Sequence, residues 1–229
     1  MAYALLVSWS DRATPTAVKG RDTLGRVAAA VRFRNSQSYW EDRYLTGGTS
    51  GPGSYDRQAE YKAHFINGFV REKAIASVIE FGCGDGNQLG LAEYPRYLGI
   101  DVAPSAVRRC IEAFGADKSK SFITCDVRAF ADRGRFLHAD LGLSLDVVFH
   151  LVEDDVFEAY MHALFDAADR FVIIYARDRE ARDPGRHVRW RKYTPWIESN
   201  IKGWTLSRVE PAPQADYQDF HVFARVGAS

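Results

Sequence analysis

Three glycines at alternate positions follow an acid and a short apolar run in this chain of 229 residues. The segment reads Glu80-Phe-Gly-Cys-Gly-Asp-Gly86. Glycine has no Cβ, so such a turn can bend sharply and lets a ligand lie against the main chain. The dinucleotide fingerprint GxGxxG requires glycine where this chain has Asn87, and a phosphate loop requires a Gly-Lys-Ser/Thr triplet that is absent. The spacing therefore argues against both of these phosphate-binding loops.

Residues that could bind a nucleoside or accept a proton follow at the ends of later apolar runs. Asp101 comes about twenty residues after Glu80, where a carboxylate can accept hydrogen bonds from both ribose hydroxyls. His150 is the first candidate for a general base, because a pKa of roughly 6.5 suits proton transfer near neutrality. His187 is a second candidate. A structural histidine bonded to a backbone carbonyl is the alternative for His150.

Seven apolar segments are spaced like the strands of an α/β sheet. The first five are separated by helix-length connections, which parallel neighbours need, whereas the last two have a short link and suggest an antiparallel pair. We expect a three-layer, Rossmann-like fold with a mostly parallel seven-stranded sheet, an antiparallel C-terminal strand and an N-terminal helical cap. The expected strands cover 77–81, 96–102, 121–127, 145–151, 170–176, 203–209 and 219–225. Helices are expected over 104–114 and 154–168. Two more are expected to begin near Asn87 and at Thr194, with Thr194 as the N-cap.

The turn at 80–86 resembles motif I of class I S-adenosylmethionine-dependent methyltransferases, an acid, any residue, and then Gly-x-Gly-x-Gly. The resemblance covers residues 77–178 and, more loosely, the last two strands. It implies S-adenosylmethionine as cofactor, methyltransferase activity, a cofactor-binding methyltransferase domain over 77–229 and an N-terminal helical or lid segment over 1–76. Asp126 and Val127 would recognise the adenine and Val102 would pack on it. The implied cofactor-binding residues of the domain are Glu80, Gly82, Gly84, Asp101, Val102, Asp126, Val127 and Phe149.

The N-terminal part contains aromatic residues beside a glycine-rich stretch at 38–55. Such a segment can act as a lid over a ligand, and Tyr44, Ser54 and Tyr55 are the candidates to contact the cofactor there. The alternative is a surface loop whose aromatic residues anchor the preceding helix. Upstream, a basic stretch from Lys19 to Arg34 could touch RNA or a membrane surface, although a solvated helix face is the commoner explanation.

A stretch dense in arginine and aromatic residues follows the fifth expected strand. Arg189, Trp190 and Tyr193 are the candidates to bind the acceptor, since arginine bonds anionic groups and tryptophan offers a stacking face. They suggest an acceptor with an anionic or sugar-like group. A cationic surface segment is the alternative.

Acids near the ends of the fourth and fifth strands raise the question of a metal. They are Asp178 and the run Glu153-Asp-Asp155. Acids in the first turn of a helix explain the run without a metal, so none is expected.

Composition narrows the partner classes. Lys and Arg together number 30, as do Asp and Glu, and this zero net charge disfavours nucleic acid. Three cysteines without CxxC spacing favour a reducing compartment. No apolar run approaches the roughly 20 residues that span a bilayer, so a cytoplasmic protein is expected.

Some DNA and RNA methyltransferases act on amino groups, and resemblance to them depends on an Asn/Asp-Pro-Pro-Tyr/Phe signature. The residues after the fourth expected strand lack this signature. This absence and the balanced charge favour a small acceptor. The function that the resemblance implies is therefore methyl transfer to a small molecule, expected at oxygen, in natural-product, glycan or peptide tailoring. An RNA or protein methyltransferase and a non-catalytic cofactor-binding regulatory protein are the alternatives.

Overall fold

The computed structural model describes residues 33–181, 187–214 and 217–227. All of them belong to one compact unit, Val31–Ser229, which contains both the first two helices and the sheet. The basic stretch singled out in the sequence lies outside the described residues up to Arg32. In the described ranges, no helix combines the length and the apolar character needed to cross a membrane.

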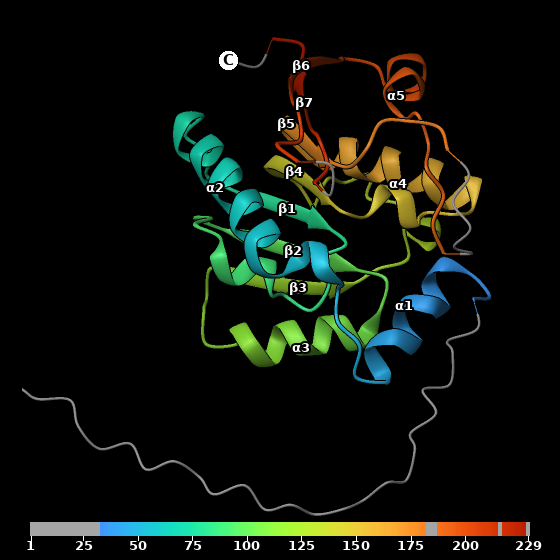
Figure 1. Cartoon of the computed structure of the whole chain (residues 1–229). Helices are drawn as coiled ribbons and strands as arrows, with labels where there is room; N and C mark the ends of the chain where they lie inside the picture. The colour runs from blue at the N-terminus through green and yellow to red at the C-terminus, as the bar shows by residue number, and fades with distance from the viewer. Residues whose placement is uncertain (1–32, 182–186, 215–216, 228–229) are drawn as a thin grey trace, which may run out of the picture. The chain divides into compact units, whose positions relative to one another are not determined.

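Seven strands form one sheet in the order β3-β2-β1-β4-β5-β7-β6 (Figure 1). Strands β1 to β5 run parallel, and β7 is antiparallel to both of its neighbours. This arrangement confirms the fold predicted from the sequence. The strands are β1 (Val78–Phe81), β2 (Tyr97–Asp101), β3 (Lys120–Thr124), β4 (Ala139–Leu145), β5 (Ala168–Tyr175), β6 (Trp204–Glu210) and β7 (Phe220–Arg225).

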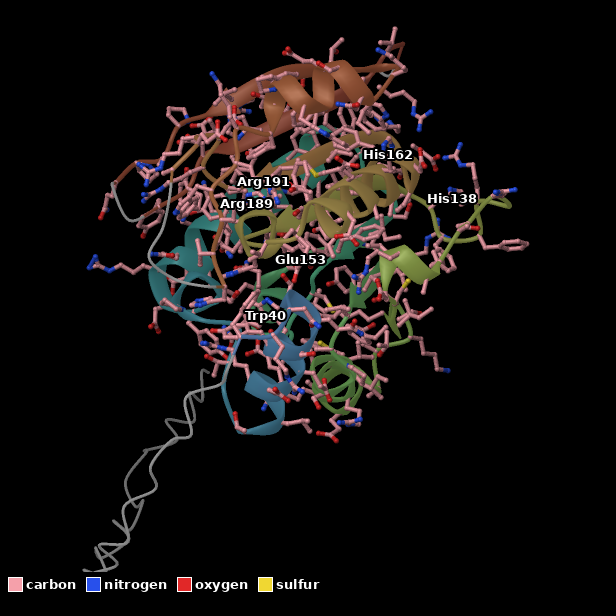
Figure 2. All side chains as sticks on the ribbon, turned by 90° about the vertical axis from the view of Figure 1, so that its right-hand side faces the viewer. Trp40, His138, Glu153, His162, Arg189 and Arg191 are labelled. Carbon is pink, nitrogen blue, oxygen red and sulfur yellow. The ribbon has the colours of Figure 1, made fainter. Side chains whose placement is uncertain are left out.

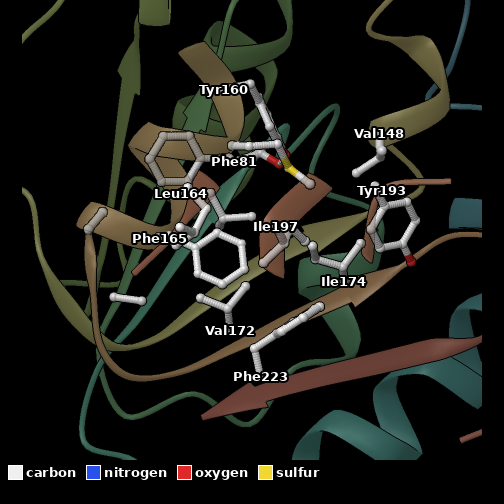
Figure 3. Close-up of a cluster of buried hydrophobic side chains, with 14 of the residues drawn as sticks. Phe81, Val148, Tyr160, Leu164, Phe165, Val172, Ile174, Tyr193, Ile197 and Phe223 are labelled. Carbon is white, nitrogen blue, oxygen red and sulfur yellow. Dashed lines mark hydrogen bonds between the residues drawn. The ribbon is translucent and has the colours of Figure 1, made fainter. Parts of the chain in front are cut away.

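Helices cover both faces of the sheet because its central strands are apolar on both sides. On one face α2 buries Ile66 against Leu141, and α3 packs on β2 and β3. On the other face α4 buries Leu164 against Val172 and Ile174 (Figure 3). The helices are α1 (Ser36–Leu45), α2 (Asp56–Glu72), α3 (Pro104–Phe114), α4 (Asp154–Asp166) and α5 (Thr194–Asn200).

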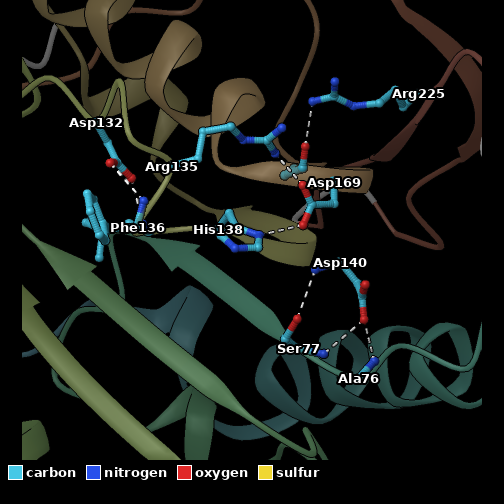
Figure 4. Close-up of polar contacts among 11 residues, drawn as sticks. Ala76, Ser77, Asp132, Arg135, Phe136, His138, Asp140, Asp169 and Arg225 are labelled. Atoms are coloured by element: carbon cyan, nitrogen blue, oxygen red, sulfur yellow. Dashed lines mark hydrogen bonds and ion pairs between the residues drawn. The ribbon is translucent and has the colours of Figure 1, made fainter.

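Polar side chains join the amino ends of the strands, at the edge away from the glycine turn (Figure 4). The carboxylate of Asp140 accepts hydrogen bonds from the backbone N–H groups of Ala76 and Ser77. The carboxylate of Asp169, at the start of β5, accepts from the guanidinium of Arg135 and lies 2.7 Å from Nδ1 of His138. These contacts hold the strand starts and leave the opposite edge to form a site.

The fourth strand was predicted in the wrong place. It covers Ala139–Leu145, whereas Val148–His150 forms a short 3-10 turn, η4. Asp146, between them, has a φ of 60°, a left-handed conformation that ends the extended backbone. The apolar run therefore continues past the strand into a turn, and Phe149 and His150 lie in that turn rather than at a strand end.

Two helix predictions also need correction. The residues after Asn87 form only a 3-10 turn, η2 (Gln88–Leu91), because Gly90 and the short link to β2 leave no room for a helix. Helix α5 begins at Thr194, but Thr194 is not its cap. The carboxylate of Asp178 accepts from the N–H groups of Tyr193 and Thr194 at 2.6 and 3.1 Å.

Candidate functional site

A cavity lies at the carboxyl ends of β1 and β4, where ligands bind in open α/β sheets. The space that it encloses together with the open solvent at its mouth is about 1070 Å³. The structure brings ten predicted residues together in its lining: Tyr44, Ser54, Glu80, Gly82, Gly84, Asp101, Val102, Asp126, Val127 and His150.

The glycine turn needs residues without side chains. Gly82, Gly84 and Gly86 have φ angles of 83°, 59° and 81°, which L-residues rarely adopt. A Cβ on Gly82 would lie 2.4 Å from Cγ2 of Val147, and one on Gly84 would lie 2.3 Å from Oγ of Ser50. The bare backbone therefore forms one wall of the cavity.

Asp101 links this turn to the end of β2. Its Oδ2 accepts from the N–H of Gly84 and its Oδ1 from the N–H of Ala103, both at 2.9 Å. Burial raises the pKa of Asp101 to about 6, although the N–H groups of Ala103 and Gly84 favour the charged form. Each carboxylate oxygen has a second lone pair, so Asp101 can also accept from the two hydroxyls of a ribose.

Glu80 points to the face of the sheet that α2 covers. Tyr97 donates its hydroxyl to Oε2 of Glu80 at 2.6 Å. Burial raises the pKa of Glu80 to about 7, while this hydrogen bond and the charge of Lys62 act in the opposite direction. The site therefore holds a carboxyl group that titrates near neutrality.

Asp126 and two valines lie on the other side of Asp101. Arg128 binds the carboxylate of Asp126, at 3.0 Å from both its backbone N–H and its guanidinium. That contact lowers the pKa of Asp126 and keeps it charged. Val102 and Val127 supply apolar walls beside it, which suit a planar base.

The segment from Tyr44 to Tyr55 crosses the glycine turn and is anchored on Asp85. The carboxylate of Asp85 accepts from the N–H of Ser50 at 2.9 Å and from the hydroxyl of Tyr55 at 2.8 Å. The hydroxyls of Ser50 and Tyr44 lie 3.0 Å apart. Tyr55 therefore holds the turn without lining the cavity. Neither Asp85 nor Ser50 stood out in the sequence, because their contact joins residues 35 positions apart.

His150 lies in the turn after β4, at the cavity wall. Its Nδ1 is 3.1 Å from the carbonyl oxygen of His187, so Nδ1 is the nitrogen that carries the proton and Nε2 keeps its lone pair. Burial lowers the pKa of His150 to about 4, which leaves the ring neutral at neutral pH. The ring of Trp40 packs edge-on against the imidazole, with 4.8 Å between the two ring centroids. His150 thus combines the carbonyl contact of the structural alternative with an Nε2 whose lone pair can accept a proton.

The residues predicted to bind the acceptor lie outside the cavity lining and contact residues around it. Arg189 donates to the carbonyl of Val152 and pairs with Asp154 at 2.9 Å (Figure 2). Trp190 packs against Phe149 at 4.8 Å. Tyr193 is fully buried, with its hydroxyl 2.8 Å from Nδ1 of His221. His187 stacks on Tyr39 at 4.6 Å. The lining of the cavity therefore includes none of these four residues, and it does not include Phe149 either.

The acids considered for a metal have protein partners. Glu153 accepts from the backbone N–H of Ser36 at 3.0 Å and lies 2.6 Å from its hydroxyl. Asp154 pairs with Arg191, and Asp178 caps α5. Across the described ranges, no three His, Cys, Asp or Glu side chains are grouped as a metal site would need.

Lys62 and Asp146 are cavity residues that the sequence analysis missed. The ammonium of Lys62 is fully buried and lies 2.7 Å from Oδ2 of Asp146. Lys62 falls in the buried stripe of α2, between Ala59 and Ile66, and that position for a lysine is the signal that could have found it.

Comparison with known proteins supports the fold. No family model and no curated protein matches the sequence. Among solved structures, the N-methyltransferase NodS of Bradyrhizobium japonicum, with bound S-adenosyl-L-homocysteine, has 19% identity and a TM-score of 0.64 and covers 83% of this chain and 98% of its own. Magnesium protoporphyrin IX methyltransferase (ChlM) of Synechocystis has 17% identity and a TM-score of 0.60, covering 82% and 97%. The methyltransferase domain of a bacterial Hen1 has 19% identity and a TM-score of 0.58, covering 72% and 96%.

These similarities and the strand order define the fold. The chain has the fold of class I S-adenosylmethionine-dependent methyltransferases, as motif I predicted.

Replacing Glu80 by glutamine is expected to change stability in a pH-dependent way. The pKa of Glu80 rises from 4.5 to about 7 on folding, so the folded state binds more protons between these values and loses stability as the pH rises through this window. A glutamine does not titrate. The unfolding free energy of Glu80→Gln relative to the wild type should therefore increase by roughly 3 kcal/mol from about pH 4 to about pH 8.

Chemical denaturation of both proteins across this pH range measures the difference. The other buried groups, Asp101 and His150, are present in both proteins and largely cancel. A difference that stays constant with pH would contradict the assignment of a raised pKa to Glu80.

Proposed function

We propose that this chain is an S-adenosylmethionine-dependent methyltransferase that methylates an oxygen of a small-molecule acceptor. The observation that carries the proposal is the buried Asp101 carboxylate, bonded to the N–H of Gly84 and lining the same cavity. This pair offers a ribose-binding acid beside a bare backbone wall. Similar solved structures that contain S-adenosylhomocysteine or S-adenosylmethionine support the choice of cofactor.

The charges in the cavity fit this cofactor. Its lining contains five carboxyl groups against the two cations Lys62 and Arg128; the acids are Glu80, Asp101, Asp126, Asp146 and Glu153. An excess of acids in a partly dry cavity favours a positively charged ligand. When bound, S-adenosylmethionine supplies a methyl group on a positively charged sulfur that is its own leaving group.

The residues of this chain then have to orient the acceptor and exclude water, which can lower a barrier by about 7–11 kcal/mol in good model systems. Trp40 and the segment from Tyr44 to Ser54 cover the cavity and perform both tasks. His150 takes up the hydroxyl proton of the acceptor at Nε2. A hydroxyl oxygen that gains a methyl group becomes strongly acidic, so a neutral imidazole of low pKa suffices.

A small acceptor is supported by the balanced charge of the chain. ChlM is a methyltransferase of magnesium protoporphyrin IX and NodS is an N-methyltransferase, whereas HEN1 is a small RNA methyltransferase. An acceptor screen that reads S-adenosylhomocysteine release should therefore include hydroxyl compounds, amines and small RNA.

Asp101→Asn is expected to weaken cofactor binding strongly. Two hydrogen bonds from ribose hydroxyls to a buried carboxylate would be impaired, which corresponds to an affinity loss on the order of 100-fold. Calorimetry with S-adenosylhomocysteine measures it, with NAD as the ligand that should not bind. Asp117→Asn, at an exposed turn acid, is the matched control and should bind normally. Unchanged binding by a folded Asp101→Asn would remove this residue from the site.

His150→Gln is expected to lower kcat on the order of 100-fold while leaving the affinity for S-adenosylhomocysteine nearly unchanged. The reason is that His150 acts on the acceptor's proton. His64→Gln, at an exposed histidine of α2, is the control and should keep full turnover. The pH profile gives a second test: because the pKa of His150 is about 4, its loss of activity on acidification should fall near that pH. If the wild type instead lost activity at about pH 6.5, and this loss were absent in His150→Gln, the lowered pKa of His150 would be contradicted.

A further inference from the structure

The start of α1 is joined to the turn that carries His150 through one serine. Ser36 is buried, and its Oγ lies 2.8 Å from the carbonyl oxygen of His150 and 2.6 Å from Oε2 of Glu153. The same Oγ accepts from the N–H of Val152 at 3.3 Å. Ser36, His150 and Glu153 also line the cavity. One side chain of α1 therefore holds three residues of the turn after β4.

Glu153 serves α1 rather than its own helix. It stands directly before α4, between that helix and α1 (Figure 2), but its side chain makes no cap hydrogen bond to α4. Its Oε1 instead accepts from the backbone N–H of Ser36 at 3.0 Å, a group that has no partner within α1. The dipole of α1 also favours a carboxylate at this end. Asn35 already fills the N-cap position, so Glu153 is an additional contact that fixes α1 on the site.

The next turn of α1 reaches the imidazole of His150 in two ways. The ring of Trp40 packs edge-on against the imidazole, with 4.8 Å between the ring centroids. Tyr39 stacks on His187 at 4.6 Å, and the carbonyl of His187 is the partner of Nδ1 of His150. Residues three and four apart share a helix face, so Tyr39 and Trp40 lie on the same face as Ser36. That face contacts the backbone of His150, its ring and the residue that selects its tautomer.

We propose that Ser36 and Glu153 are positioning residues for the methyl transfer, because their contact holds α1 on the turn after β4 and thereby fixes the imidazole of His150 at the cavity wall. The proposal rests on the proposed function, since it assigns the residues that hold His150 for its role as base. In this arrangement α1 does more than cover the ligand: its docking also orients the base. A displacement of about 1 Å can lower a rate roughly 100-fold, so loss of the contact is measurable.

Ser36→Ala removes the hydroxyl and keeps the backbone N–H that Glu153 accepts. With the acceptor found in the screen, kcat should fall on the order of 10-fold or more. The Kd for S-adenosylhomocysteine and the KM for the acceptor should stay within about threefold, because Ser36 acts through His150. Ser38→Ala, on the same helix turn but outside the cavity lining, is the matched control and should keep full turnover.

The tautomer of His150 is a second readout, which needs no acceptor. NMR of the imidazole nitrogens at neutral pH measures it, and His150→Gln assigns the signals. The wild type and Ser38→Ala should show the Nδ1–H tautomer, bonded to the carbonyl of His187. In Ser36→Ala the signals should report a mixture of both tautomers. A merely structural role of Ser36 would lower the free energy of unfolding and leave these signals unchanged.

Variants of Glu153 separate the contact from the charge. Glu153→Gln keeps an oxygen for the N–H of Ser36 and an amide donor for its hydroxyl, so kcat and the tautomer should stay near the wild type. Glu153→Ala should behave like Ser36→Ala. Because both side chains act through one contact, the double variant Ser36→Ala/Glu153→Ala should lower kcat no more than about twofold beyond either single variant. If an alanine variant does not fold, Ser36→Cys, which keeps the shape with a weak donor, gives the same test with a smaller decrease.

The outcomes separate the two levels of the account. A folded Ser36→Ala with wild-type kcat or wild-type His150 signals overturns the positioning role and leaves the proposed function intact. An equal loss of turnover in Ser38→Ala, or a loss confined to ligand affinity, also overturns it. A wild type that does not bind S-adenosylhomocysteine contradicts the proposed function instead, and the NMR comparison still decides whether Ser36 holds His150.

Discussion

The hydrogen bond from the N–H of Gly84 to the carboxylate of Asp101 joins the turn after β1 to the end of β2, at 2.9 Å in a buried setting. A buried carboxylate is unfavourable unless donors surround it, and here the donors are the backbone of the glycine turn and of Ala103. The left-handed φ of Gly84 turns its N–H towards that carboxylate. The position of the acid and the shape of the turn therefore depend on each other, and the rest of the cavity is arranged around this pair.

The two ends of the cavity, on either side of Gly84 and Asp101, differ in their charged groups. Near Asp126 the acid is held charged by Arg128, and apolar valines stand beside it. Near α2 the buried Lys62 pairs with Asp146, and burial raises the pKa of the nearby Glu80 to about 7. The segment from Tyr44 to Tyr55 is joined to the glycine turn through the hydrogen bonds of Ser50 and Tyr55 to Asp85.

The sequence predicted the sheet, the glycine turn and Asp101 because each depends on local features: apolar period, missing Cβ atoms and spacing along the chain. It misplaced the fourth strand, since apolarity at 147–149 does not reveal that Asp146 leaves the extended conformation. Lys62 and Asp146 are 84 positions apart, and only the packing of α2 on the sheet brings them together. Tyr193 was predicted to bind the acceptor from its aromatic surroundings, but its hydroxyl lies near His221, which no local pattern reveals.

The central claim is that the glycine turn and Asp101 hold an adenosyl group at the carboxyl edge of the sheet. Crystals of the full chain grown with saturating S-adenosylhomocysteine test it most directly. The account predicts ribose oxygens within hydrogen-bond distance of both carboxylate oxygens of Asp101, the base between Val102 and Val127, and the sulfur beside the Gly82–Gly84 backbone. Density for the ligand elsewhere, or none along this edge at saturation, would contradict it.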